Sequence, residues 1–116
     1  MKLPEEIIIE TVLDHFDLKY EILKCRSRLM EYVKARYIIM YFCKQYTNLS
    51  LSTIGRIFNK DHCTVMFGVQ QVAIQMEVNK DYRVMIERLD VILKSKEGFI
   101  KSKVGEEVFQ ENDYYI

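Results

Sequence analysis

The chain has 116 residues, of which 49% are hydrophobic, and its formal net charge is zero. That length suits one domain with one core and excludes two full-sized domains, while the apolar content excludes a wholly disordered chain. No apolar run approaches the roughly 20 residues of a membrane span, and the acidic start of the chain excludes a secretory signal. Three cysteines without metal-ligand spacing indicate free thiols in a reducing cytosol, so we expect a cytoplasmic protein.

The neutral total hides an uneven distribution of charge. Residues 24–71 carry eight basic and two acidic residues, whereas the segments before and after them are acidic. A basic middle between acidic ends is a footprint of polyanion binding, and by itself a weak one.

Apolar residues recur every three or four positions, which predicts an all-α fold of about six helices. A first helix begins after Pro4 and ends near Phe16. Residues 17–24 resemble a short second helix that Asp17 can cap and that buries Ile22 and Leu23. A polar, basic connection follows. A third helix runs over about 32–46, with these residues on or near its buried side: Val33, Ile38, Tyr41, Phe42 and Gln45.

The segment "TNLS" at 47–50 interrupts the pattern, and Ser50 can cap a fourth helix over about 51–58. Asp61 can cap a fifth helix over about 62–78, and Asn79 or Asp81 can start a sixth. Their predicted apolar stripes are Val65, Met66, Val69, Val72 and Met76 on the fifth helix, and Tyr82, Met85, Leu89, Ile92 and Leu93 on the sixth. Regularity is lost after about residue 96. We therefore expect a helical domain over 1–96 and a tail over 97–116, either mobile or docked through Phe109 and Tyr114.

The fourth and fifth helices have the outline of a helix-turn-helix, joined by the polar stretch "FNKDHCTV" at 58–65. In such a motif the second helix enters the major groove, and its N-terminal residues meet base edges. Asp61, His62 and Thr64 are placed for that contact, while Val65 and Val69 turn back into the core. A glycine at position 55 fits a close approach between the two helices.

The stretch "SLSTIGRIFNKDHCTVMFGVQQV" resembles the C-terminal DNA-binding domain of the bacterial replication initiator DnaA, a Trp-repressor-like helix-turn-helix. The resemblance extends to "RSR" at 26–28 and "KQYTNLSL" at 44–51, and covers about residues 5–94. The "DHxTV" element at 61–65, in this helical order, is its most specific part.

The resemblance implies a set of DNA contacts. Arg28 matches an arginine that enters the minor groove, and Arg36 matches one that reads a base in the major groove. Lys44 and Lys60 match positions able to reach phosphate. The recognition helix would contribute Asp61, His62, Cys63 and Thr64. Cys63 stands where the family has a threonine and offers a small apolar surface to a thymine methyl.

Other departures concern the loop before the third helix. Leu29, Met30 and Glu31 stand where the family is polar and basic, Ala35 replaces a proline, and the turn before Lys60 is one residue shorter. These changes predict a shifted sequence preference or a lower affinity for the family's usual target.

No phosphate loop of the GxxxxGK[ST] form, catalytic triad or metal-ligand cluster occurs in the sequence. We therefore expect a freestanding DNA reader that is no enzyme, has no cofactor and binds neither nucleotide nor membrane. Cys63 beside His62 is a poor candidate nucleophile, because no third group is identifiable to orient a base.

The function that we predict is sequence-selective binding of double-stranded DNA, in replication, its regulation or transcription, including on a mobile element. The alternative is a protein-interaction module on the same scaffold that has lost strong DNA binding and contacts a replication or regulatory protein. Simpler interpretations stay open for single residues: Asp61 as a cap alone, His62 as a surface residue, and Arg28 and Arg36 as solvated charges.

Overall fold

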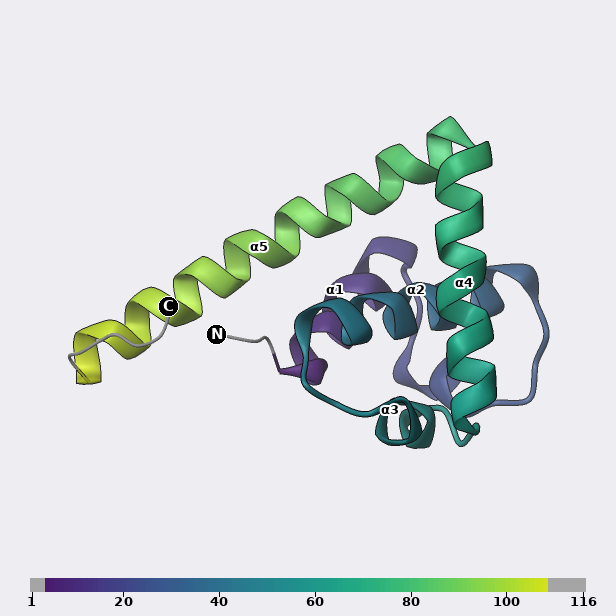
Figure 1. Ribbon diagram of the computed structural model, residues 1–116, viewed down its shortest axis with the longest axis horizontal. Helices are drawn as coiled ribbons and strands as arrows, with labels where there is room; N and C mark the ends of the chain where they lie inside the picture. The colour runs from purple at the N-terminus through teal and green to yellow at the C-terminus, as the bar shows by residue number, and fades with distance from the viewer. Residues whose placement is uncertain (1–3, 109–116) are drawn as a thin grey trace.

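The computed structural model describes the backbone of residues 4–108 and the side chains of residues 4–96 (Figure 1). Residues 4–108 form five α-helices and one 3-10 helix, without a strand in that range. The elements in chain order are α1 (Glu5–Phe16), η1 (Tyr20–Leu23), α2 (Met30–Tyr46), α3 (Leu51–Ile57), α4 (His62–Val78) and α5 (Lys80–Val108). The all-α prediction is confirmed, and most predicted boundaries lie within two residues of the observed ones.

The first connection differs from the prediction. Asp17 does not cap a following helix; it ends α1 in the left-handed conformation, with φ of 56°, and its N–H donates back to the carbonyl of Asp14. Asp tolerates this conformation better than most residues because its short polar side chain can hydrogen-bond locally. The predicted second helix is the single 3-10 turn η1, and its Ile22 and Leu23 are buried as expected.

Helix α2 lies at the centre of the fold and contacts α1, η1, α3 and α4. Because it is surrounded on several sides, its buried residues do not form one narrow stripe. They include Ala35, Ile38, Ile39, Met40, Phe42 and Cys43. The prediction placed Ile38 and Phe42 correctly, missed Ile39 and Met40, and was wrong for Gln45, which is exposed.

Helix α4 packs closely against α2 at Gly68. A Cβ atom added there would lie 2.8 Å from Tyr37 Cδ1 and 2.9 Å from Met40 Sδ, so a larger residue would push the helices apart. Val65 and Val72 are buried on the same side of α4, whereas Met66 is exposed, contrary to the prediction.

Asn79 directly precedes α5, and its side chain accepts a hydrogen bond from the Tyr82 N–H in the first turn of the helix at 3.1 Å. It buries Ile86, Leu89 and Leu93, while Ile92 is exposed, which corrects the predicted stripe. The backbone stays helical to Val108, past the predicted loss of regularity at about residue 96, and its far end projects beyond the other helices (Figure 1). Phe109 and Tyr114 lie outside the described residues.

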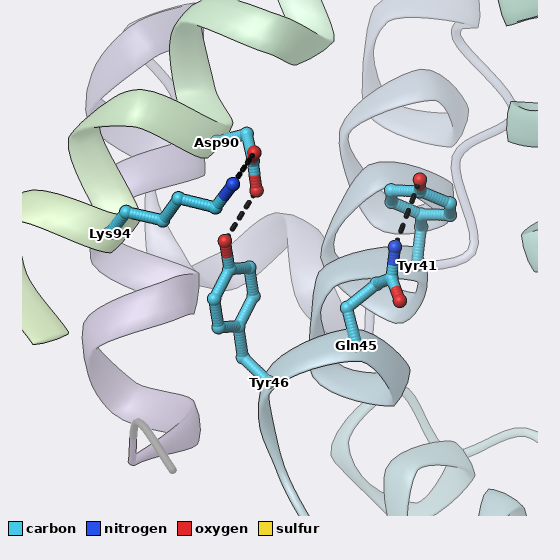
Figure 2. A network of polar contacts seen from close by, with 5 residues as sticks. All are labelled: Tyr41, Gln45, Tyr46, Asp90 and Lys94. Carbon is cyan, nitrogen blue, oxygen red and sulfur yellow. Dashed lines mark hydrogen bonds and ion pairs between the residues drawn. The ribbon is translucent and has the colours of Figure 1, made fainter. Parts of the chain in front are cut away.

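Polar contacts fasten α5 to the rest of the domain. The Tyr46 hydroxyl, at the end of α2, donates to Asp90, and the second oxygen of Asp90 lies 3.1 Å from Lys94 Nζ (Figure 2). Figure 2 also shows Gln45 and Tyr41 hydrogen-bonded along the exposed side of α2. Of these contacts, the hydrogen bond between Tyr46 and Asp90 joins two helices, and it holds α5 at the end of α2 opposite to the one that carries the basic loop.

Candidate nucleic-acid interface

The turn between α3 and α4 is tight. The carbonyl of Gly55 accepts from the Lys60 N–H at 2.8 Å, and Asn59 takes the left-handed conformation with φ of 58°. A Cβ atom at position 55 would lie 2.4 Å from the Lys60 carbonyl oxygen. Gly55 is therefore at a close approach, but the predicted partner was wrong: the neighbouring atoms belong to the backbone of the turn at Lys60 and Asp61, not to the second helix.

Asp61 caps α4, as predicted. Its Oδ1 accepts from the Thr64 N–H at 2.9 Å and from the Thr64 hydroxyl at 3.0 Å. These two hydrogen bonds, the backbone one first, hold the pKa of the Asp61 carboxyl below its ordinary value, and the nearby His62 acts in the same direction. The cap fixes the direction in which the first turn of α4 presents its side chains.

The front turn of α4 faces solvent. His62 and Cys63 are exposed and Thr64 is half-buried, with His62 Nε2 3.6 Å from Cys63 Sγ. Val65 is fully buried and Val69 packs against the core, as predicted. The N-terminal end of α4 is thus polar and exposed, whereas the rest of the helix buries apolar residues. Backbone N–H groups and the positive end of the helix dipole lie at this N-terminal end and favour an anion.

The segment 24–29, named here the basic loop, connects η1 to α2. Arg26 and Arg28 are exposed in it, whereas Cys25 and Ser27, each preceding one of these arginines, are half-buried. The loop lies beside α4, on the side of the molecule away from the projecting end of α5 (Figure 1).

The position of Arg36 does not fit the role expected for it, which was to read a base. Its side chain is only 7% exposed, and its Nε donates to the Ile22 carbonyl at 2.7 Å. Its other donors reach the carbonyls of Ser27 and Cys25, both at 3.0 Å, and the Cys25 Sγ, also at 3.0 Å. These donors are committed to the basic loop, so a base contact by Arg36 would require them to be given up.

The basic loop and the front of α4 line one groove of about 850 Å³. It brings together Arg28, Arg36, Lys60, Asp61, Cys63 and Thr64 from the predicted site, and Lys24, Arg26, Asn59, Tyr37 and Phe67 in addition. Five of the lining residues are basic and one is acidic. His62 and Lys44 are exposed but lie outside this lining, Lys44 in the last turn of α2.

Sequence reasoning assigned no role to several residues of the groove. Lys24 was counted only within the basic middle, and Arg26 only there and within the matched "RSR", although both alternate with half-buried positions up to Arg28. Tyr37 and Phe67 form an edge-to-face pair with ring centroids 6.0 Å apart, and no local pattern links residues on two different helices. Lys34, outside the groove, was likewise counted only within the basic middle, and its Nζ lies over the rings of Phe16 and Tyr82.

Two other kinds of feature are absent from the described residues. Among the described side chains, no three of His, Cys, Asp and Glu gather closely enough to hold a metal ion. Within residues 4–108, no helix has the combined length and apolar content that crossing a bilayer requires.

Fold and groove together define a helix-turn-helix domain with a basic loop beside its second helix. A family model, described as the bacterial dnaA protein helix-turn-helix, matches residues 5–72. The chain therefore belongs to the helix-turn-helix family of bacterial DnaA proteins.

Individual relatives agree with this assignment. Over 90 residues the chain is 41% identical to the chromosomal replication initiator protein DnaA of Bacteroides thetaiotaomicron, and equally to that of Bacteroides fragilis. It is 36% identical over 90 residues to the protein of the same name from a Nostoc species. The match covers 77% of this chain but only 19% of the length of the Bacteroides proteins.

Proposed function

We propose that this domain binds double-stranded DNA with sequence preference, in replication initiation or its regulation. The observation that carries the proposal is the shared groove. It is lined by Arg28 from the basic loop, by Asp61 at the N-cap of α4 and by Thr64 in the first turn of α4. The names of the DnaA relatives as replication initiators support the biological setting.

In this proposal the front turn of α4 enters the major groove. The exposed His62 and Cys63 meet base edges there, His62 through its ring nitrogens and Cys63 through its small apolar surface. Thr64 donates its hydroxyl proton to Asp61, so it offers lone pairs to a ligand. An acceptor of this kind suits the amino group of adenine or cytosine better than it suits a phosphate oxygen.

The basic loop supplies the second contact. Arg28 is exposed and lines the groove of the protein. In this proposal it enters the minor groove of the DNA, next to the major groove that α4 occupies. Lys24, Arg26 and Lys60 line the space between these two elements, where the intervening phosphates would run. Lys44, outside the groove lining, is a further phosphate contact.

The test is a titration of a labelled duplex at several salt concentrations. Four phosphate contacts, by Lys24, Arg26, Lys44 and Lys60, predict a slope of about −3.6 in log K against log salt, or roughly a 100-fold loss between 50 and 200 mM. Binding that is absent at low salt, or that does not change with salt, would contradict the proposal.

One observation favours a second candidate, a protein-interaction module. Leu29 is 54% exposed and Met30 is 81% exposed, where the basic loop joins α2. Exposed apolar side chains of this size are common at protein interfaces. If this candidate is correct, substitution of Met30 by Ser abolishes partner binding without changing affinity for DNA.

A further inference from the structure

Arg36 binds the backbone at two points of the basic loop and at one point of η1, just before it. The accepting carbonyls belong to Ile22, Cys25 and Ser27, at distances of 2.7, 3.0 and 3.0 Å. All three precede Arg36 in the chain, by 14, 11 and 9 residues. One guanidinium therefore ties two carbonyls of the basic loop and one of η1 to the first half of α2.

Besides the bonds to Arg36, the basic loop is fixed at its two ends: Cys25 packs against the core and its Sγ donates to the Ile22 carbonyl at 3.7 Å, and the Leu29 carbonyl accepts from the first turn of α2. Residues 25–29 belong to no helix or strand, and within them Leu29 N donates to Ser27 Oγ at 3.3 Å. Exposure alternates along this segment: Cys25 and Ser27, whose carbonyls Arg36 holds, are half-buried, whereas Arg26 and Arg28 are exposed. The bonds to Arg36 therefore decide which side of the loop faces the solvent and the groove.

We infer that Arg36 is a positioning residue for DNA binding: it holds the basic loop so that Arg28 faces the DNA, and it makes no base contact itself. This inference rests on the proposed function. It differs from the role that the family resemblance implied, in which Arg36 reads a base directly.

The chemistry of guanidinium explains why an arginine is needed. Its planar fork presents donors in three directions at fixed angles, whereas lysine has a single compact ammonium group. Lysine at position 36 keeps the positive charge but cannot hold the carbonyls of Ile22, Cys25 and Ser27 together. The loop would then be disordered before binding, and ordering it would weaken DNA binding about tenfold to a hundredfold.

A double-mutant cycle separates positioning from direct contact. The affinity of the full chain for a duplex is measured by fluorescence anisotropy for the wild type, Arg28→Ala, Arg36→Lys and the double variant. If Arg36 acts through Arg28, the double variant binds about as weakly as Arg36→Lys alone, because the contribution of Arg28 is already lost. If Arg36 contacts DNA independently, the two losses multiply, and the inference is overturned.

Lys44→Ala is the matched control, because Lys44 lies outside the groove lining, in the last turn of α2, whereas the basic loop joins the first turn. The fold-loss of DNA affinity caused by Lys44→Ala should multiply with the fold-loss caused by Arg36→Lys. A wild type that binds no duplex overturns the proposed function together with this inference, whereas multiplying losses in the Arg28 cycle overturn the inference alone.

A second measurement on the wild type covers the case in which Arg36→Lys fails to fold. The Arg36 Nε–H is followed by NMR in the free protein and in the DNA complex. The inference predicts a signal that exchanges slowly with water and keeps its position when DNA is added. A large shift of that signal on binding, with loss of its protection, would show that Arg36 leaves the loop for the DNA and would overturn the inference.

Discussion

Asp61 accepts two hydrogen bonds from Thr64, one from the backbone N–H at 2.9 Å and one from the hydroxyl at 3.0 Å. The same pair caps α4 and lines the groove, so the proposed function makes stability and DNA affinity depend on the same atoms. A substitution at either residue has to be measured for stability and for affinity, and the two effects can be separated by the choice of variant.

Asp61→Asn and Asp61→Ala make this separation. Asparagine caps helices about as well as aspartate, whereas alanine does not. We expect Asp61→Asn to unfold near the wild-type urea midpoint at pH 7 but to bind its preferred duplex more weakly. Asp61→Ala should lose stability as well as affinity. Equal losses of stability in both variants would show that the charge, and not the cap, is the stabilising feature.

The stability contributed by Asp61 should depend on pH. Because the hydrogen bonds from Thr64 lower the pKa of this carboxyl below 3.8 in the folded state, the stabilisation is present above that pH and is lost as the pH falls through the lower folded value. Urea unfolding between pH 2 and 6 should therefore show a steeper acid decline for the wild type than for Asp61→Asn. Parallel curves would contradict the assignment.

The geometry of the turn between α3 and α4 predicts how substitutions at Gly55 and Asn59 change stability. A methyl group at position 55 overlaps the Lys60 carbonyl, so Gly55→Ala should destabilise the domain by about 1–3 kcal/mol. Asn59→Ala should cost about 1 kcal/mol, because alanine is strained at positive φ, whereas Asn59→Gly should be close to neutral. Chemical unfolding measures all three, and a neutral Gly55→Ala would contradict the observed turn.

Two lysines of the basic middle should behave differently. Lys34 Nζ lies 5.8 Å from the ring centroid of Phe16 and 5.3 Å from that of Tyr82, and so links α1, α2 and α5. We expect Lys34→Ala to lower stability by about 1 kcal/mol and to leave the salt slope of DNA binding unchanged. Lys60→Ala should do the reverse: little change in stability, and a slope smaller by about 1.

Cys43 and Cys63 should differ in their reactivity toward alkylating reagents, and DNA should lower the reactivity of Cys63. Cys43 is buried in α2, and burial raises the pKa of its thiol to about 12, so alkylation should require unfolding. Cys63 is exposed at the front of α4 and should react in the folded protein. Saturating duplex DNA should protect Cys63 from iodoacetamide, as measured by mass spectrometry, and added salt should remove the protection. Unchanged reactivity at Cys63 would place the front of α4 outside the DNA contact.

Local patterns predicted the parts of the fold that are decided locally. Ser50 and Asp61 cap α3 and α4 as expected, because a cap is a relation between residues three apart. Val65 and Val72 were placed correctly since α4 has one buried side. The prediction of buried residues was only partly correct for α2, because this helix is buried on several sides and so shows no single apolar stripe.

The groove depended on contacts between distant segments, and these were predicted only in part. The resemblance to the DnaA domain brought Arg28 together with Asp61 and Thr64, which the structure places around one groove. It could not indicate that Arg36 is committed to carbonyls of this particular loop, since those bonds depend on backbone positions and not on residue types. Nor could it pair Tyr37 with Phe67.

The most direct test of the central claim is a selection from random duplexes with the full chain, followed by sequencing. If the exposed turn of α4 reads bases beside the basic loop, the wild type should enrich a defined motif. His62→Ala should enrich a broader one, and Lys44→Ala should enrich the wild-type motif with lower yield. A wild type that enriches no motif, or a His62→Ala variant that enriches the same motif as the wild type, would contradict the account.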